Sequence, residues 1–102
     1  MSVKREPSSS SRSSWTFLTN HAHVLIALAR DPSTRVRDLA EVVGITERAV
    51  QQILTDLESG TVIERIRTGR RNAYRVNPAV QLRHPLEAQH RVGELLALAA
   101  EG

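Results

Sequence analysis

Residues 36–53, VRDLAEVVGITERAVQQI, decide the fold of this chain. Apolar residues recur at helical spacing on both sides of Gly44, which is the pattern of two short amphipathic helices. Glycine adopts the left-handed backbone conformation that a tight turn requires, and Thr46 offers a side chain that can cap the helix after it. The stretch therefore predicts a helix from Val36, a sharp turn at Gly44 and a second helix that begins two or three residues later.

Three positions in this stretch follow a recurring pattern. Ala40, four residues before the turn glycine, is small enough for the two helices to approach closely, and Val50, six residues after it, packs the second helix over the first. The pattern closely resembles the helix-turn-helix motif of bacterial regulators. Further apolar residues fall where that motif places its core: Leu39, Val43, Ile45 and Ile53. The resemblance implies that the helix after Thr46 is a recognition helix, whose N-terminal half enters a major groove.

Another helix is predicted before the motif. Asn20 can cap it and Asp31-Pro32 ends it, and its apolar residues recur at helical spacing: Val24, Leu25 and Leu28. The recognition helix itself carries a continuous apolar stripe down to Ser59-Gly60, made of Ala49, Val50, Ile53, Leu54 and Leu57. The chain is therefore expected to form three helices before Gly60.

Beyond Gly60 the pattern changes to β-branched and aromatic residues, which favour strands: Val62, Ile63, Ile66, Tyr74 and Val76. Residues 68–72 separate the two runs as a short turn, so the segment predicts a β-hairpin. Glu64 interrupts the alternation of the first strand, and the pattern leaves the strand register open.

Five arginines lie on or beside this turn: Arg65, Arg67, Arg70, Arg71 and Arg75. The winged variant of the motif carries its wing at this position, and the run GRRNAY of residues 69–74 resembles the wing tip of many MarR-like and ArsR-like regulators. The resemblance implies a fold that is mainly α with a small β-hairpin. The expected architecture is a winged helix-turn-helix domain over residues 15–77 with an additional C-terminal helix.

Charge is distributed unevenly along the chain, whose net charge is +3. Residues 36–59 sum to −3 and residues 60–83 to +5, and arginine presents a planar fork of donors suited to phosphate and guanine. The acidic residues Glu47, Asp56 and Glu58 predict that the recognition helix alone attracts DNA poorly. The affinity for DNA is therefore expected to come mainly from the wing.

The predicted DNA-binding residues combine the polar face of the recognition helix with the wing. Glutamine can pair bidentately with adenine and arginine with guanine, and Thr46 can bond a phosphate beside the positive end of the helix. Wing cations on phosphates would fix the register while helix side chains read the bases. The predicted set is Thr46, Glu47, Arg48, Gln51, Gln52, Thr55, Arg65, Arg67, Arg70, Arg71 and Asn72.

The segments outside this domain carry separate expectations. Residues 1–14 form a basic, serine-rich tail that cannot bury enough apolar surface to fold, so disorder is expected. Asn77-Pro78 and His84-Pro85 read as two helix starts, and a helix from Pro85 to Ala100 is predicted within a helical segment over 78–102. One apolar face of it either forms a homodimer contact or covers its own domain: Leu86, Val92, Leu95, Leu96 and Ala99.

Composition argues against several other classes of protein. The sequence has no cysteine, which rules out disulfides, thiolate metal sites and cysteine nucleophiles. No apolar run approaches the roughly 20 residues of a membrane helix, and the serine-rich start does not read as a secretory signal, so a cytoplasmic protein is expected. The acidic residues fall singly, and neither a Ser-His-Asp order nor a glycine-rich phosphate loop is present. We therefore expect no enzymatic activity and no cofactor.

The four histidines offer one possible metal site. His21, His23, His84 and His90 have the imidazole groups that zinc prefers, but their spacing is not diagnostic, so no metal is expected. A small-molecule effector is not revealed either, because its pocket would be a shape between helices rather than a motif.

The sequence thus predicts a regulator of transcription that binds double-stranded DNA sequence-specifically, acts as a homodimer and represses by occluding its operator. A winged-helix module that binds protein is the alternative, because a fold does not determine a function, although such a surface does not require the wing arginines. RNA binding is least favoured, since Trp15, Phe17 and Tyr74 are the only aromatic residues and offer no stacking platform.

Overall fold

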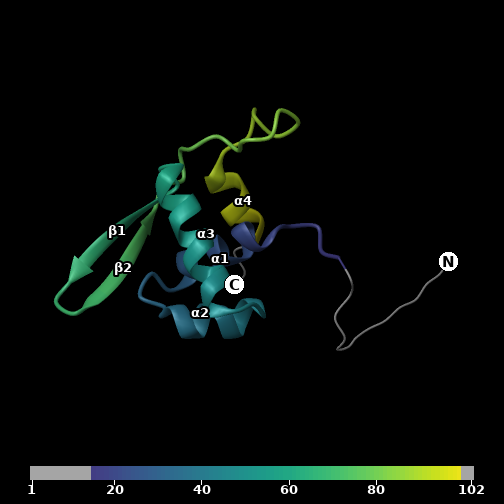
Figure 1. The fold of residues 1–102 in the computed structure, drawn as a ribbon. Coiled ribbons are helices and arrows are strands. Elements are labelled where there is room, and N and C mark those ends of the chain that lie inside the picture. Colours follow the sequence, from purple (N-terminus) through teal and green to yellow (C-terminus); the bar gives the residue numbers. More distant parts are fainter. Residues whose placement is uncertain (1–14, 100–102) are drawn as a thin grey trace.

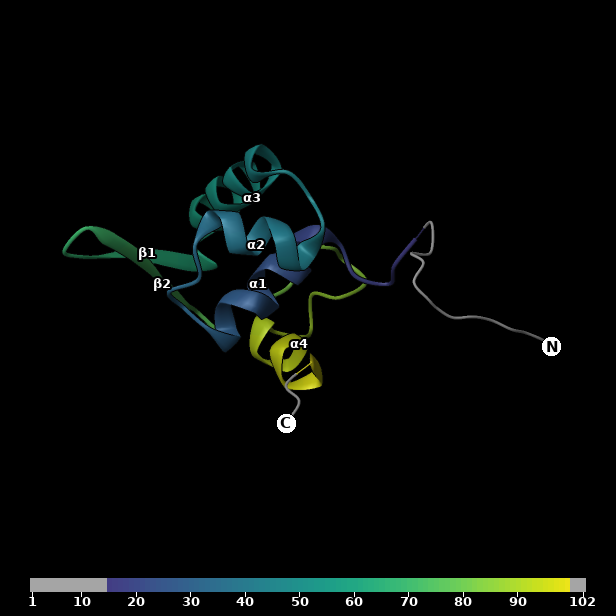
Figure 2. The ribbon, with the colours of Figure 1, turned by 90° about the horizontal axis from the view of Figure 1, so that it is seen from below.

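The computed structural model describes residues 15–99, in which six elements follow one another. They are α1 (Asn20–Arg30), α2 (Val36–Val43), α3 (Glu47–Ser59), β1 (Ile63–Thr68), β2 (Arg71–Val76) and α4 (Val92–Ala99). The β1–β2 hairpin projects from one side of the helices as a wing (Figure 1), and α1 lies between α2 and α4 (Figure 2). The predicted fold class is confirmed. The expected disorder of residues 1–14 concerns a segment that lies outside the described residues.

The first helix begins one residue earlier than the sequence predicts. Thr19 is the cap: its backbone is extended, and its Oγ1 accepts a hydrogen bond from the amide of Ala22 at 3.3 Å. Asn20, predicted as the cap, is the first helical residue, and its Oδ1 lies 3.2 Å from His23 Nδ1. Threonine and asparagine both cap helices well. When the two are neighbours, the sequence alone does not show which of them is the cap.

The turn between α2 and α3 has the predicted form. Gly44 takes the left-handed conformation at φ +86°, and the amides of Gly44 and Ile45 both bond the carbonyl of Ala40, at 2.8 and 3.0 Å. Thr46 then caps α3, since its Oγ1 accepts from the amide of Ala49 at 3.0 Å. Ala40 and Val50 are both buried where the two helices meet. The turn thus fixes the direction in which α3 leaves α2.

The hairpin has a single register, from Ile63 opposite Val76 to Thr68 opposite Arg71. The predicted five-residue turn is too long, because only Gly69 and Arg70 connect the strands, and Gly69 has a positive φ of +62°. Glycine at the first position of a two-residue loop suits a turn whose twist matches the strands, so the remaining predicted turn residues join the ladder. Glu64 does not disturb the register.

Two backbone hydrogen bonds attach the wing to the helices. The amide of Tyr74 donates to the carbonyl of Pro32 in the α1–α2 loop at 3.0 Å, and the amide of Val62, the residue before β1, donates to the carbonyl of Leu57 on α3 at 2.9 Å. Ile63 and Tyr74 are buried at the base of the hairpin. The base of the wing therefore belongs to the core, while its tip extends away from it.

The predicted helix from Pro85 to Ala100 is wrong in its first half. Residues 77–91 form turns, and Gln81 and Arg91 make a single antiparallel bridge that closes them into a loop. The helix α4 begins only at Val92, where the carboxylate of Glu94 accepts from the amide of Arg91 at 3.0 Å. A glutamate in the first turn of a helix can cap it by accepting a hydrogen bond from the amide just before the helix. The cap by Glu94, rather than a proline, therefore sets the start of α4.

The core lies between α1, α2, α3, the wing base and the start of α4. Its fully buried side chains are Val24, Leu28, Leu39 and Val50. Val92 is buried with them, and Leu96 packs partly against them, so two of the five predicted dimer residues stabilise their own domain. Leu86, in contrast, stays 82% exposed in the loop. Within residues 15–99, none of the helices has the length and apolar character that crossing a membrane requires.

The left-handed turn gives a first test. A Cβ added at Gly44 would meet no heavy atom within 4 Å, so alanine there suffers backbone strain without any clash. We expect Gly44→Ala to lower the free energy of unfolding by about 1–2 kcal/mol in urea titrations. Gly44→Asn is expected to lose less, because asparagine tolerates this conformation. Equal stability of the wild type and Gly44→Ala would contradict the assigned turn.

Candidate nucleic-acid interface

The surface of α3 that faces away from the core carries a row of polar residues. Val50, Ile53, Leu54 and Leu57 point into the core. On a helix of 3.6 residues per turn, the opposite ridge is formed by Arg48, Gln52 and Thr55, all of which are exposed. Gln51 and Glu47 lie on the flank of this ridge, on the same side as Glu58. The ridge is the part of the predicted recognition surface that projects furthest from the domain.

Thr46 lies at the start of the same helix. Its cap uses the hydroxyl oxygen as an acceptor for the amide of Ala49, so the hydroxyl hydrogen can still donate to a phosphate. Thr55, the last residue of the ridge, instead donates its hydroxyl hydrogen to the carbonyl of Gln51 at 3.0 Å. The hydrogen of Thr55 is therefore already used within the helix.

An aspartate on α3 joins the recognition ridge to α1. The carboxylate of Asp56 accepts from Gln52 Nε2 at 3.0 Å through Oδ1, and its Oδ2 lies 2.8 Å from His21 Nε2. The hydrogen bond from His21, followed by the one from Gln52, lowers the pKa of Asp56 below its ordinary value. Each oxygen of the Asp56 carboxylate therefore has a hydrogen-bond partner.

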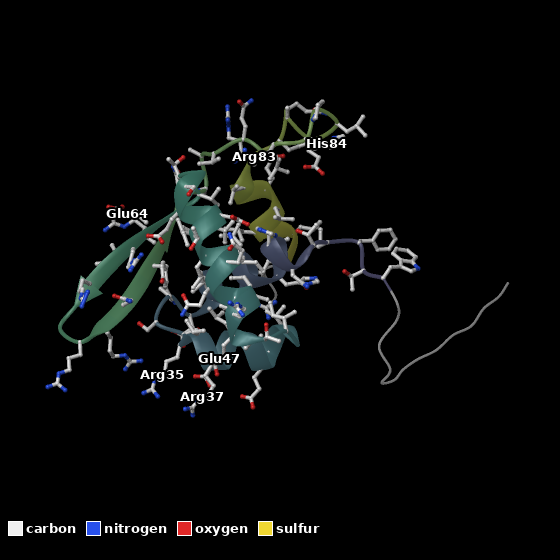
Figure 3. The ribbon with its side chains drawn as sticks, in the orientation of Figure 1. Arg35, Arg37, Glu47, Glu64, Arg83 and His84 are labelled. Carbon is white, nitrogen blue, oxygen red and sulfur yellow. The ribbon has the colours of Figure 1, made fainter. Side chains whose placement is uncertain are left out.

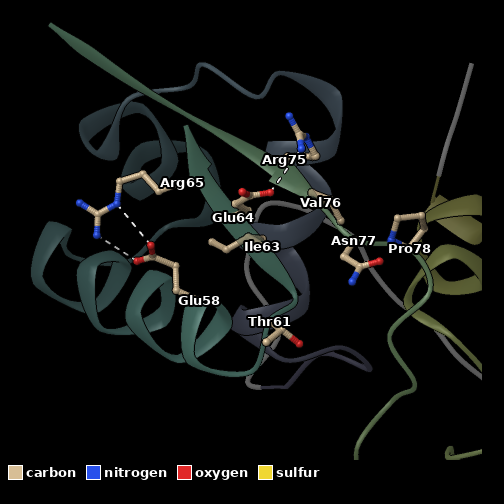
Figure 4. Close-up of a pocket in the computed structure, with 9 residues that line it drawn as sticks. All are labelled: Glu58, Thr61, Ile63, Glu64, Arg65, Arg75, Val76, Asn77 and Pro78. Atoms are coloured by element: carbon tan, nitrogen blue, oxygen red, sulfur yellow. Dashed lines mark hydrogen bonds and ion pairs between the residues drawn. The ribbon is translucent and has the colours of Figure 1, made fainter. Parts of the chain in front are cut away.

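Another acidic residue of α3 forms a salt bridge with the wing. Glu58 accepts two hydrogen bonds from Arg65, at 3.3 Å from Nε and 3.1 Å from Nη2, and this pairing raises the pKa of the guanidinium (Figure 4). On the outer face of the hairpin, Arg75 pairs with Glu64 at 3.3 Å. An open hollow of about 690 Å³ lies between these pairs. Arg65, predicted to contact DNA, is placed where it holds β1 against α3.

The outer part of the wing keeps its cations exposed. Arg67 and Asn72 are opposite each other, on the hairpin face that also carries Tyr74, and Arg70 lies in the turn. Within residues 15–99, Arg67 and Arg70 make no ion pair. Arg71 Nη2 donates a long 3.5 Å hydrogen bond to the carbonyl of Ser33. These side chains can therefore reach an anionic partner without breaking an internal salt bridge.

The start of α2 adds two arginines that the sequence prediction missed. Arg35 and Arg37 project at the same end of the molecule as Glu47, the first residue of α3 (Figure 3). A hollow of about 350 Å³ between this helix start and the wing is lined by residues 33–36, by residues 70–72 and by Tyr74. The arginines of the two segments lie some 35 positions apart in sequence, so only the folded topology brings them together.

The remaining predicted sites can be placed as well. Within residues 15–99 no three histidine, cysteine or acidic side chains gather closely enough to hold a metal ion. His21 pairs with Asp56 and His90 with Glu94. An apolar cavity of about 420 Å³ lies between α1, the loop over 81–90 and α4, and its walls include Phe17, Leu25 and Leu95.

Comparison with known families identifies the segment that carries this surface. Residues 19–67 match a family model described as winged helix-turn-helix DNA-binding. The match begins at the cap of α1 and ends inside β1, so it contains all of α2 and α3. A comparison with curated protein sequences yields no significant match. The recognition ridge and the start of the wing therefore lie in the segment that is similar to winged helix-turn-helix DNA-binding domains.

The paired aspartate predicts how stability depends on pH. Because the pKa of Asp56 in the folded chain is below the ordinary value of 3.8, its contribution is present above that value and is lost as the pH falls through the lowered pKa. We expect the wild type to be more stable than Asp56→Asn at pH values above 3.8, and the gap to shrink as the pH falls through the lowered pKa. Urea titrations across this range measure it, and a gap independent of pH would contradict the assignment.

Proposed function

Starting from the winged helix-turn-helix DNA-binding domain at residues 19–67, we propose that the protein is a sequence-specific transcriptional regulator of the MarR-like and ArsR-like type. The observation that carries the proposal is a set of exposed arginines on three elements: the ridge of α3, the start of α2 and the outer wing. The start of α2 and the wing tip line one hollow. In this arrangement Arg48 and Gln52 read base edges in the major groove, and Arg67 and Arg70 contact the backbone or minor groove.

Charge pairing inside the domain supports this binding mode. Two of the acidic residues that would repel DNA, Asp56 and Glu58, are bound by His21 and Arg65. Six arginines of the described residues that make no ion pair there lie at the start of α2, on α3 or on the wing: Arg35, Arg37, Arg48, Arg67, Arg70 and Arg71. Phosphate neutralisation by such residues supplies most of the sequence-independent affinity for DNA. A surface that binds another protein would have no need for this concentration of arginine.

The regulator is proposed to act as a cytoplasmic homodimer and repressor. Two-fold symmetry would place two recognition helices in successive major grooves about 34 Å apart, and the bound dimer would occlude the operator. Four large apolar residues are exposed outside α2, α3 and the wing: Trp15, Phe17, Leu86 and Leu98. The segment before α1 extends away from the wing (Figure 1), and α4 lies on the other side of α1 from α2 (Figure 2). A contact there leaves the DNA-binding surface free.

The wing assignment is tested by a pair of arginine variants. Arg70→Ala removes one phosphate contact, so it is expected to weaken binding to all duplex sequences alike and to reduce the salt slope by about 1. Arg83→Ala is the control, because Arg83 lies at the opposite end of the molecule from Arg35 and Arg37 (Figure 3). Fluorescence anisotropy at several salt concentrations measures both. An unchanged salt slope for Arg70→Ala would refute the wing contact, and absence of DNA binding by the wild type would refute the function.

The dimer is tested by charging its proposed face. Leu98 is 78% exposed on α4, so Leu98→Glu leaves the core intact and is expected to convert the dimer to monomer in analytical ultracentrifugation. Val42→Glu introduces the same charge at a residue of α2 that is 75% exposed, and this variant is expected to remain dimeric. A wild-type protein that sediments as a monomer at micromolar concentration would contradict the dimer.

A further inference from the structure

The amide of Gln52 has a defined orientation in this structure. A carboxylate can only accept hydrogen bonds, so the contact of 3.0 Å with Asp56 Oδ1 requires the Nε2 end of the amide to face Asp56. The carbonyl oxygen Oε1 therefore turns the other way. A glutamine on an exposed helix surface ordinarily moves among many rotamers, whereas this one is tied to a neighbour one turn along α3.

Asp56 is itself held from the opposite side. Its second oxygen, Oδ2, lies 2.8 Å from Nε2 of His21, which belongs to the first turn of α1. The histidine side chain is about half exposed, as is that of Asp56. The lowered pKa of Asp56 agrees with a carboxylate that keeps its charge between two donors. The three residues thus form a chain of contacts from α1 through Asp56 to the recognition ridge.

The end of this chain lies where a base would be read. Gln52 is on the exposed ridge with Arg48 and Thr55, opposite the buried stripe of α3. An amide nitrogen has two hydrogens, so one can bond Asp56 while the second stays beside Oε1 as a donor–acceptor pair. Adenine offers the complementary pair in the major groove, an acceptor at N7 and a donor at N6. Guanine offers two acceptors there, one of which would face Oε1.

We propose that Asp56 and His21 are positioning residues that orient the amide of Gln52 to select adenine over guanine. The inference rests on the proposed DNA-binding function and names the specificity of one residue within it. Asp56 provides the acceptor that prevents the amide from turning over, and His21 keeps Asp56 in place. Neither residue touches DNA. The adenine preference at one operator position is therefore set by contacts inside the domain.

The test begins by finding the operator position that Gln52 contacts. Selection of wild-type protein from a random duplex pool gives the preferred site, and Gln52→Ala identifies the base pair at which preference is lost. At that pair the wild type is expected to favour adenine over guanine by roughly tenfold, within the range of a good bidentate contact. Affinities for the site with each of the four bases are then measured by fluorescence anisotropy.

The decisive variant is Asp56→Asn, which keeps the size of the side chain but allows it either to accept or to donate a hydrogen bond. The amide of Gln52 can then present either end, so guanine is expected to bind about as well as adenine at this position. His21→Ala is expected to reduce the preference by a smaller factor. Glu94→Gln makes the same chemical change in the other histidine–carboxylate pair, on α4, and is expected to keep the wild-type preference.

The base preferences of these variants separate failure of the inference from failure of the proposed function. An adenine preference that survives Asp56→Asn overturns the inference, and so does an equal loss of affinity for all four bases, which would indicate a purely structural role. If Gln52→Ala changes no base preference, Gln52 does not read the operator and the inference also fails. A wild-type protein that selects no sequence, or binds no duplex, refutes the proposed function instead.

Discussion

The left-handed turn at Gly44 is the constraint on which the rest of the structure depends. It brings two amides onto the carbonyl of Ala40 and directs the chain into α3, which Thr46 then caps. Ala40 and Val50 are buried where the helices meet, so the angle between α2 and α3 is set by close packing rather than by a flexible link. This turn therefore sets the direction of the ridge of α3 relative to the start of α2.

The charge of the surface depends on pairing as much as on composition. By sequence, residues 36–59 are net acidic and residues 60–83 strongly basic. In the fold, Arg65 and Arg75 are used by Glu58 and Glu64, so the wing has fewer free cations than its sequence suggests. Arg35 and Arg37, at the start of α2, compensate for them at the same end of the molecule as the start of α3. The positive surface is thus shared among three elements.

Local patterns in the sequence predict most of this fold, because the residues that decide it lie close together in the chain. Gly44, Thr46 and the apolar stripe of α3 each act within one or two helical turns. The C-terminal segment is different: a proline at 85 suits a helix start, but a bridge between Gln81 and Arg91 and the cap by Glu94 place the start at Val92. The apolar periodicity of the sequence does not show that these contacts outweigh the preference of a proline for a helix start.

The same distinction applies to the candidate site. Gln52 and Arg48 are identified from helical spacing, since exposure on α3 follows from the position of its buried stripe. The long-range neighbours of the site are not, because His21 lies 35 positions from its partner Asp56 and the start of α2 lies as far from the wing tip. Sequence therefore indicates which side chains face outward, and only the fold shows which of them are already bound.

The central claim, that α2, α3 and the wing form one DNA-binding surface, is tested most directly by an NMR titration of the isotopically labelled protein with a duplex recovered by selection. The account predicts amide shift changes concentrated at the start of α2, along the N-terminal half of α3 and at the wing tip, with little change in the loop over 81–90. Shift changes confined to α4 and that loop, with α3 unaffected, would contradict it.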